Sequence, residues 1–122
     1  MAIYKFISWN VNGIRAVDKK EAFKWVDEHD IHLLGIQETK SMKEQIPKTI
    51  FNKEFKTMTA SASAIKGRSG TALFTDIETT FECNCPTVDI LDEGRINEVH
   101  FTLGNKNIAF FNVYFPNGQS KE

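Results

Sequence analysis

The sequence has little of what marks a membrane, secreted or disordered protein. Its 122 residues include only two cysteines and three prolines. No apolar run approaches the about 20 residues that a membrane-spanning helix needs. The N-terminus lacks the charged start and the small-residue cleavage site of a signal peptide. Two cysteines cannot form a disulfide framework. We therefore expect a reduced, cytoplasmic protein with no membrane partner.

An excess of charge of one sign is also absent. Fifteen Lys and Arg residues face sixteen Asp and Glu residues, which gives a formal net charge of −1. Overall charge thus provides no signal for nucleic-acid binding, and only a local basic patch could provide one. What is present is ordinary: 41% hydrophobic and 25% charged residues, as in a single folded domain that buries roughly two-thirds of its unfolded surface.

The first third of the chain predicts a strand–helix–strand unit. Residues 3–9 are rich in strand-forming side chains, and residues 10–17 form a loop containing Gly13. Asp18 is suited to be a helix N-cap with Glu21 as its reciprocal partner, which predicts a helix over residues 18–28. Residues 31–37 are almost continuously apolar, which is typical of a parallel strand covered on both faces.

The rest of the chain predicts antiparallel strands separated by turns. Residues 41–52 form a loop with a short helical turn, and Gly104-Asn105 has the composition of a hairpin turn. Further turns are expected at residues 64–70 and 92–95. The expected strands are residues 55–61, 70–75, 79–85, 96–103 and 108–115.

Polar side chains follow both strands of the first unit. Asn10 comes after the first strand and Glu38 after the second. Ligands bind at the carboxyl ends of such strands, and Mg²⁺ is usually held by only one or two carboxylates. Glu38 therefore has two interpretations: a metal ligand, or a surface carboxylate that begins a helix and favours its positive end. Asn12-Gly13 is equally consistent with a plain turn.

Other polar residues have two interpretations each. Tyr114 follows an apolar strand and could donate to a phosphoryl oxygen, or it could be a core Tyr with its hydroxyl at the rim. His29, His32 and His100 lack metal-ligand spacing and favour structural roles. Six cations fall in loops or near helix starts, where they would form either a phosphate-binding rim or solvated surface charge: Arg15, Lys19, Lys20, Lys66, Arg68 and Arg95.

Five ordered motifs give the sequence a family resemblance. They are Ser8-Trp9-Asn10-Val11-Asn12-Gly13-Ile14-Arg15-Ala16, Leu34-Gly35-Ile36-Gln37-Glu38-Thr39-Lys40, Arg68-Ser69-Gly70-Thr71-Ala72-Leu73, Asp92-Glu93-Gly94-Arg95 and Asn112-Val113-Tyr114-Phe115-Pro116-Asn117-Gly118. With them the chain resembles the exonuclease III family of apurinic/apyrimidinic endonucleases, within the endonuclease/exonuclease/phosphatase superfamily. The motifs span essentially the whole chain.

The resemblance implies a DNase I-like, two-sheet α/β sandwich. It implies hydrolysis of double-stranded DNA at abasic sites and 3′ ends with Mg²⁺ or Mn²⁺. Carried over by motif, Glu38 and Asn10 would be metal ligands, and Asn10, Tyr114 and Asn117 would be catalytic residues. The DNA-facing residues implied by the family are Arg15, Lys66, Gly67, Arg68, Ser69 and Arg95.

The sequence also departs from the family pattern. Asn12 stands where some relatives have Asp, and Arg68 stands where relatives often have an aromatic residue. The family's Gly-Asp-aliphatic-Asn and Ser-Asp-His motifs, which supply the water-activating Asp and the Asp-His pair, do not occur in the sequence.

These missing motifs imply that residues 1–122 are the N-terminal portion of one such domain. The portion would hold about one sheet with its helices, inactive alone, with an uncovered inner sheet face and the C-terminal half as its partner. Two other functions stay open: a non-catalytic DNA-binding or assembly module, and another phosphodiesterase of the superfamily.

Overall fold

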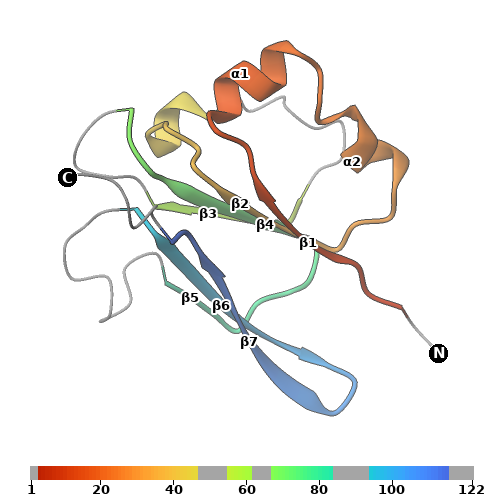
Figure 1. Ribbon diagram of the computed structural model, residues 1–122. Helices are drawn as coiled ribbons and strands as arrows, with labels where there is room; N and C mark the ends of the chain where they lie inside the picture. The colour runs from red at the N-terminus through yellow and green to blue at the C-terminus, as the bar shows by residue number, and fades with distance from the viewer. Residues whose placement is uncertain (1–2, 47–54, 62–66, 84–93, 116–122) are drawn as a thin grey trace.

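The computed structural model describes residues 3–46, 55–61, 67–83 and 94–115. It contains a four-stranded sheet in the order β1-β2-β4-β3 and a three-stranded sheet in the order β5-β6-β7 (Figure 1). The elements are β1 Phe6–Asn10, α1 Ile14–Lys19, α2 Lys24–Glu28, β2 Leu33–Gln37, the 3-10 turn η1 Lys43–Gln45, β3 Thr57–Ser61, β4 Thr71–Thr75, β5 Phe81–Cys83, β6 Ile96–Leu103 and β7 Lys106–Val113.

The strand–helix–strand unit is confirmed. β1 and β2 pair in parallel, with Asn10 opposite Gln37 at their carboxyl ends. Every residue of β2 is buried, as its continuous apolar run predicts for a strand covered on both faces. β4 then pairs antiparallel with both β2 and β3, so the sheet is mixed. The predicted strands are present, although most are shorter at their ends than the sequence pattern indicated.

The predicted single helix over residues 18–28 is wrong. α1 begins at Ile14, inside the predicted loop, and Asp18 lies within this helix instead of capping one. The backbone N–H of Ile14 donates to the Thr39 carbonyl at 3.0 Å, and its side chain is fully buried, so packing sets the helix start. Glu21 then adopts a left-handed φ of 57°, which interrupts the helix before α2.

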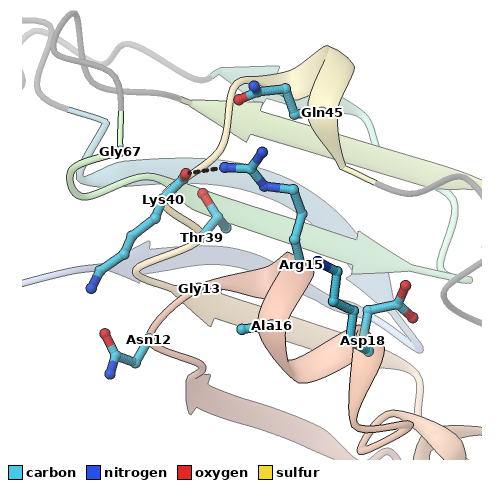
Figure 2. A pocket seen from close by; sticks show the side chains of 10 residues that line it. Asn12, Gly13, Arg15, Ala16, Asp18, Thr39, Lys40, Gln45 and Gly67 are labelled. Carbon is cyan, nitrogen blue, oxygen red and sulfur yellow. Dashed lines mark hydrogen bonds between the residues drawn. The ribbon is translucent and has the colours of Figure 1, made fainter.

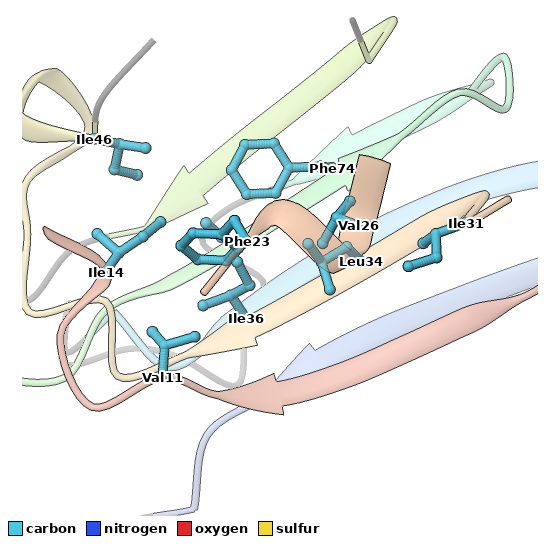
Figure 3. Packing of buried hydrophobic residues seen from close by; sticks show 10 residues of the cluster. Val11, Ile14, Phe23, Val26, Ile31, Leu34, Ile36, Ile46 and Phe74 are labelled. Atoms are coloured by element: carbon cyan, nitrogen blue, oxygen red, sulfur yellow. The ribbon is translucent and has the colours of Figure 1, made fainter. Parts of the chain in front are cut away.

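α1 and α2 cover one face of the four-stranded sheet (Figure 1). Beneath them lies a core of buried side chains in which Phe23 and Val26 meet Leu34 and Ile36 of β2 (Figure 3). Phe23 directly precedes α2 and is almost fully buried in this core. This packing holds the loop after β1 against the end of β2.

The second sheet covers the opposite face of the first (Figure 1). Leu33 of β2 and Leu73 of β4 pack against Val99 and Phe101 of β6. β6 and β7 form the predicted hairpin around Gly104, whose φ is 62°. The chain therefore contributes strands to both layers of the sandwich, where about one sheet was expected. Among the described residues, the second sheet covers the inner face that was expected to be uncovered. The predicted α/β sandwich of two sheets is therefore present.

Two further predictions can be compared with the described residues. η1 confirms the short helical turn in the loop after β2. In the part of the chain that the structure describes, no helix has the length and apolar character needed to span a bilayer. Turns were predicted at residues 64–70 and 92–95 and a strand at residues 79–85. Of these, residues 64–66, 84–85 and 92–93 lie outside the described residues.

Candidate functional site

Loops from both sheets meet at one edge of the sandwich. A row of backbone hydrogen bonds joins them, and each of these bonds links two of the five sequence motifs. The bonds run from Gly13 N–H to Glu38 O (2.7 Å), Thr39 N–H to Gly70 O (3.0 Å), Lys40 N–H to Ser69 O (2.8 Å), Gly70 N–H to Gly94 O (2.9 Å) and Tyr114 N–H to Arg95 O (2.8 Å). All five motifs therefore converge on this edge, which we call the loop edge.

Left-handed backbone is concentrated at the loop edge. Positive φ angles occur at Asn12 (49°), Gly13 (105°), Glu38 (56°), Lys40 (52°), Gly67 (78°), Ser69 (50°), Gly70 (94°) and Gly94 (65°). Elsewhere among the described residues, only Glu21 and Gly104 have a positive φ. Such conformations cost about 1–3 kcal/mol each for non-glycine residues and gather at functional sites. The clustering marks this edge as a site that tertiary contacts hold in place.

Glu38 and Asn10 lie where the sequence predicted them, at the carboxyl ends of the paired strands β1 and β2. The helix-start interpretation of Glu38 is wrong, because residues 38–42 contain no helix and Glu38 has a left-handed φ. Its side chain is half-buried. In the described chain, no hydrogen bond or ion pair reaches the Glu38 carboxylate. This carboxylate is therefore available to a ligand.

The donor atoms at this point suit a hard divalent cation only in part. Glu38 offers carboxylate oxygens, and Asn10 offers its Oδ1, which already accepts the Asn12 N–H at 3.1 Å. Among the described residues, no three His, Cys, Asp or Glu side chains are grouped to hold a metal. Mg²⁺ tolerates such a sparse set because waters and phosphate oxygens complete its shell. Glu38 and Asn10 fit as one side of a magnesium or manganese site.

A cavity of about 690 Å³ opens beside the loop edge, between α1 and the loop after β2 (Figure 2). Arg15 reaches across it from α1 and donates through Nη2 to the Lys40 carbonyl at 3.3 Å. Asn12 and Gly67 also line the cavity. Asn12-Gly13 makes the predicted turn, with both residues at positive φ.

Positive charge gathers at the loop edge although the whole chain is slightly acidic. Arg15, Lys19 and Lys40 line the cavity, against a single carboxylate, that of Asp18. Arg68 and Arg95 lie in the segments that bond to the loop after β2 and to Tyr114. A concave surface of one charge sign attracts phosphate groups over several ångströms. The loop edge therefore has the charge to attract a phosphate group.

Most of the predicted site residues can now be placed. Of the predicted set, the structure brings these together at the loop edge: Asn10, Arg15, Glu38, Gly67, Arg68, Ser69, Arg95 and Tyr114. Tyr114 is half-buried, and its backbone continues the β6–β7 ladder by one further bond. Lys66 and Asn117 lie outside the described residues.

The structure also reveals residues that the sequence interpretation passed over. Gln37, the last residue of β2, is buried and donates to the Asn112 side chain of β7 at 2.7 Å. Gly70 lies so close to Thr39 that a Cβ at position 70 would come 2.2 Å from Thr39 Oγ1. One signal was present in the sequence: an Asn at position 112 inside an otherwise apolar strand.

Comparison with known proteins finds relatives that match part of their length to this chain. An exodeoxyribonuclease of Bacillus subtilis (strain 168) is 35% identical over 117 residues, which cover 94% of this chain and 44% of that protein. The DNA repair nuclease APEX1 of Danio rerio is 44% identical over 46 residues, or 38% of this chain and 15% of that protein. No model of a protein family matches the chain.

Solved structures show the same architecture. The AP endonuclease LMAP from Leishmania major superposes with a TM-score of 0.68 at 22% identity, over 96% of this chain and 41% of that one. An AP endonuclease from Archaeoglobus fulgidus gives a TM-score of 0.67 at 24% identity, over 88% of this chain and 40% of that one. The chain spans less than half the length of these relatives.

The two packed sheets and their loop edge define the α/β, DNase I-like class of fold. Within this class, the chain is a partial homologue of the exonuclease III/AP endonuclease family of DNA-repair nucleases.

Proposed function

We propose that this chain is the N-terminal portion of a metal-dependent DNA-repair nuclease that hydrolyses phosphodiesters at abasic sites and 3′ ends. The observation that carries the proposal is the row of backbone hydrogen bonds at the loop edge, which joins all five motifs. The backbone of Glu38 takes part in this row, and the cavity beside it is lined by Arg15, Lys19 and Lys40. By itself, the chain binds DNA and does not cut it.

In this proposal, each side chain at the loop edge has a role that follows from its chemistry. Glu38 and Asn10 hold Mg²⁺ or Mn²⁺, which supplies positive charge against the charge that develops on the phosphate. Tyr114 and Asn117 bind the oxygens of the scissile phosphate through their side-chain donors. The DNA backbone is held by Arg15, Lys66, Gly67, Arg68, Ser69 and Arg95.

The proposed lack of cleavage also has a chemical basis. Hydrolysis needs a group that accepts a proton from the attacking water, within hydrogen-bond reach of it. In the described chain the loop edge offers the Glu38 carboxylate, which the metal would occupy, and Asp18, which lies in α1 on the cavity wall. The sequence contains neither the Gly-Asp-aliphatic-Asn motif nor the Ser-Asp-His motif. The remaining part of the domain would supply this group.

A cleavage assay tests the proposal. Duplex DNA with one abasic site is incubated with Mg²⁺ and either the 122-residue chain or the whole gene product that contains it. We expect incision by the whole product only. Glu38→Gln should lower kcat/KM of that product by about 100-fold or more, the loss that follows removal of one transition-state stabiliser. Glu44→Gln, an exposed Glu of η1, is the matched control and should leave kcat/KM unchanged.

The same assay separates the alternatives. Strong incision by the chain alone would refute the proposed division of the site. A gene product that ends with this chain and binds DNA without incision in any metal would favour a non-catalytic DNA-binding module. Faster hydrolysis of an inositol phosphate than of abasic DNA would favour another phosphodiesterase of the superfamily.

A further inference from the structure

A buried amide network joins the two sheets directly behind the loop edge. Gln37 Nε2 donates to Asn112 Oδ1 at 2.7 Å and to Ser8 Oγ at 3.0 Å. Asn112 Nδ2 lies within bonding distance of Asn97 Oδ1 (2.9 Å) and of two backbone carbonyls of the other sheet, those of Ile36 and Ala72 (3.0 Å each). The network thus crosses from β2 and β4 to β6 and β7.

The orientation of the Asn112 amide is set by its surroundings. Backbone carbonyls can only accept hydrogen bonds, so the atom that faces both of them must be the Nδ2 donor. Asn112 Oδ1 then faces the Gln37 amide, which donates to it. Donation therefore runs from Gln37 to Asn112 and from Asn112 onward. A carboxylate at position 112 would put an acceptor where the Nδ2 donor lies.

Polar side chains at this depth are costly unless they are fully paired. Gln37, Asn112 and Asn97 are only 8%, 3% and 0% exposed. An unpaired buried amide costs about 1–3 kcal/mol, whereas the rest of the layer between the sheets is filled with Leu, Val and Phe side chains. Gly35 makes room for the network, since a Cβ there would come 2.8 Å from Asn112 Oδ1. Apolar packing would fill this space more simply.

The network lies between the elements that carry the proposed site residues. Gln37 directly precedes Glu38 on one sheet, and Asn112 lies two residues before Tyr114 on the other. Apolar packing is non-directional and resists sliding of the sheets weakly, while hydrogen bonds fix distance and angle. We infer that the Gln37–Asn112–Asn97 network is a positioning device that sets Glu38 and Tyr114 relative to each other across the sandwich. This role rests on the proposed function; the coupling itself does not.

Hydrogen exchange of backbone amides tests the coupling without DNA, metal or catalysis. The variant Asn112→Asp replaces the donor by an oxygen facing three acceptors. We expect the amides of Thr39, Gly70 and Tyr114, which form the bonds of the loop edge, to exchange at least ten-fold faster relative to amides in the middle of the β6–β7 ladder. Local opening of this kind is distinct from global unfolding.

Two further variants keep the test decisive. Val99→Ala removes volume from the same layer and leaves the network intact, so it should speed all amides in parallel. Gln37→Met, for use if Asn112→Asp does not fold, should speed the three loop-edge amides by a smaller factor. Parallel acceleration in the Asn112 or Gln37 variant, or full protection of the loop-edge amides, would overturn the inference.

Kinetics of the whole gene product then separate coupling from function. A positioning role predicts that Asn112→Asp lowers kcat by 10-fold to 100-fold with little change in KM, since a misplacement of about 1 Å costs on the order of 100-fold. Val99→Ala should change neither. If the wild-type product does not cleave, the proposed function fails, while the exchange data still decide whether the network couples the sheets.

Discussion

Substitution of Gly70 by Ala should destabilise the chain more than the same substitution of Gly13 or Gly67 at the loop edge. Gly70 has a φ of 94°, and a Cβ there would come 2.2 Å from Thr39 Oγ1 and 3.4 Å from the Lys40 backbone nitrogen. Thr39 is 1% exposed, so its hydroxyl has little room to withdraw. Both strain and overlap therefore oppose the substitution.

The two terms can be estimated separately. A non-glycine residue in this backbone region costs about 1–3 kcal/mol, and overpacking of one methyl group costs about 1–3 kcal/mol more. The expected loss is thus roughly 2–6 kcal/mol, against a total stability of about 5–15 kcal/mol for a typical domain. Gly67→Ala is the matched control, because its φ is 78° but a Cβ there meets no heavy atom of the described residues within 4 Å. It should show the strain term alone.

Urea denaturation followed by circular dichroism measures both variants. Because the two variants share the strain term, they differ by the overpacking term of about 1–3 kcal/mol. With a slope of about 1–3 kcal/mol per molar urea, Gly70→Ala should move the midpoint down by roughly 0.3–3 M relative to Gly67→Ala. The double variant Thr39→Ala/Gly70→Ala should recover about 1–3 kcal/mol beyond additivity, since it removes the clashing oxygen. Equal midpoints for the two Gly variants, or additive behaviour of the double variant, would refute this reasoning.

Three further outcomes follow from the structure. Gly35→Ala should cost about 1–3 kcal/mol in the same urea assay, because its Cβ would overlap Asn112 Oδ1 at 2.8 Å; Asn112→Ala in the same chain should recover part of this loss, and no recovery would contradict the contact. Arg15→Ala should reduce the slope of the logarithm of the duplex-DNA binding constant against the logarithm of salt concentration by about one unit. Lys106→Ala, at the hairpin far from the loop edge, should leave this slope unchanged. Equal effects of the two variants would argue against a local cationic rim. Phe23→Ala should destabilise by about 3–5 kcal/mol, since Phe23 is 1% exposed beneath the helices, and a loss below 1 kcal/mol would show that α2 is not docked.

The local sequence pattern predicted the elements whose signals are short-range. Continuous apolar character predicted that β2 is buried on both faces, and Gly104-Asn105 predicted the hairpin of β6 and β7. The parallel pairing of β1 with β2 followed from the intervening helical segment, and it put Asn10 and Glu38 at the same edge. These features depend on the period of side chains along the chain and on turn composition, which neighbouring residues encode.

The helix between these strands shows where local signals are misleading. Asp18 and Glu21 have the spacing of a capping box, yet Asp18 lies inside α1 and Glu21 interrupts the helical segment. The start of α1 is set by the bond from Ile14 N–H to the Thr39 carbonyl and by burial of Ile14. A contact between residues so far apart leaves no trace in the residues around the helix start, and it outweighs a weak local preference.

The sequence, through its pattern and its family resemblance, therefore determined the fold class, the positions of most strands along the chain and the shared edge of Asn10 and Glu38. Only the tertiary structure decided that both sheets are present, that Gly70 must be glycine because of Thr39, and that Gln37 bonds to Asn112, 75 positions along the chain. The physical reason is the distance along the chain over which each effect acts. Propensity and periodicity act over a few residues, whereas the layer between the sheets is filled by side chains from distant segments, whose fit depends on how the completed sheets pack.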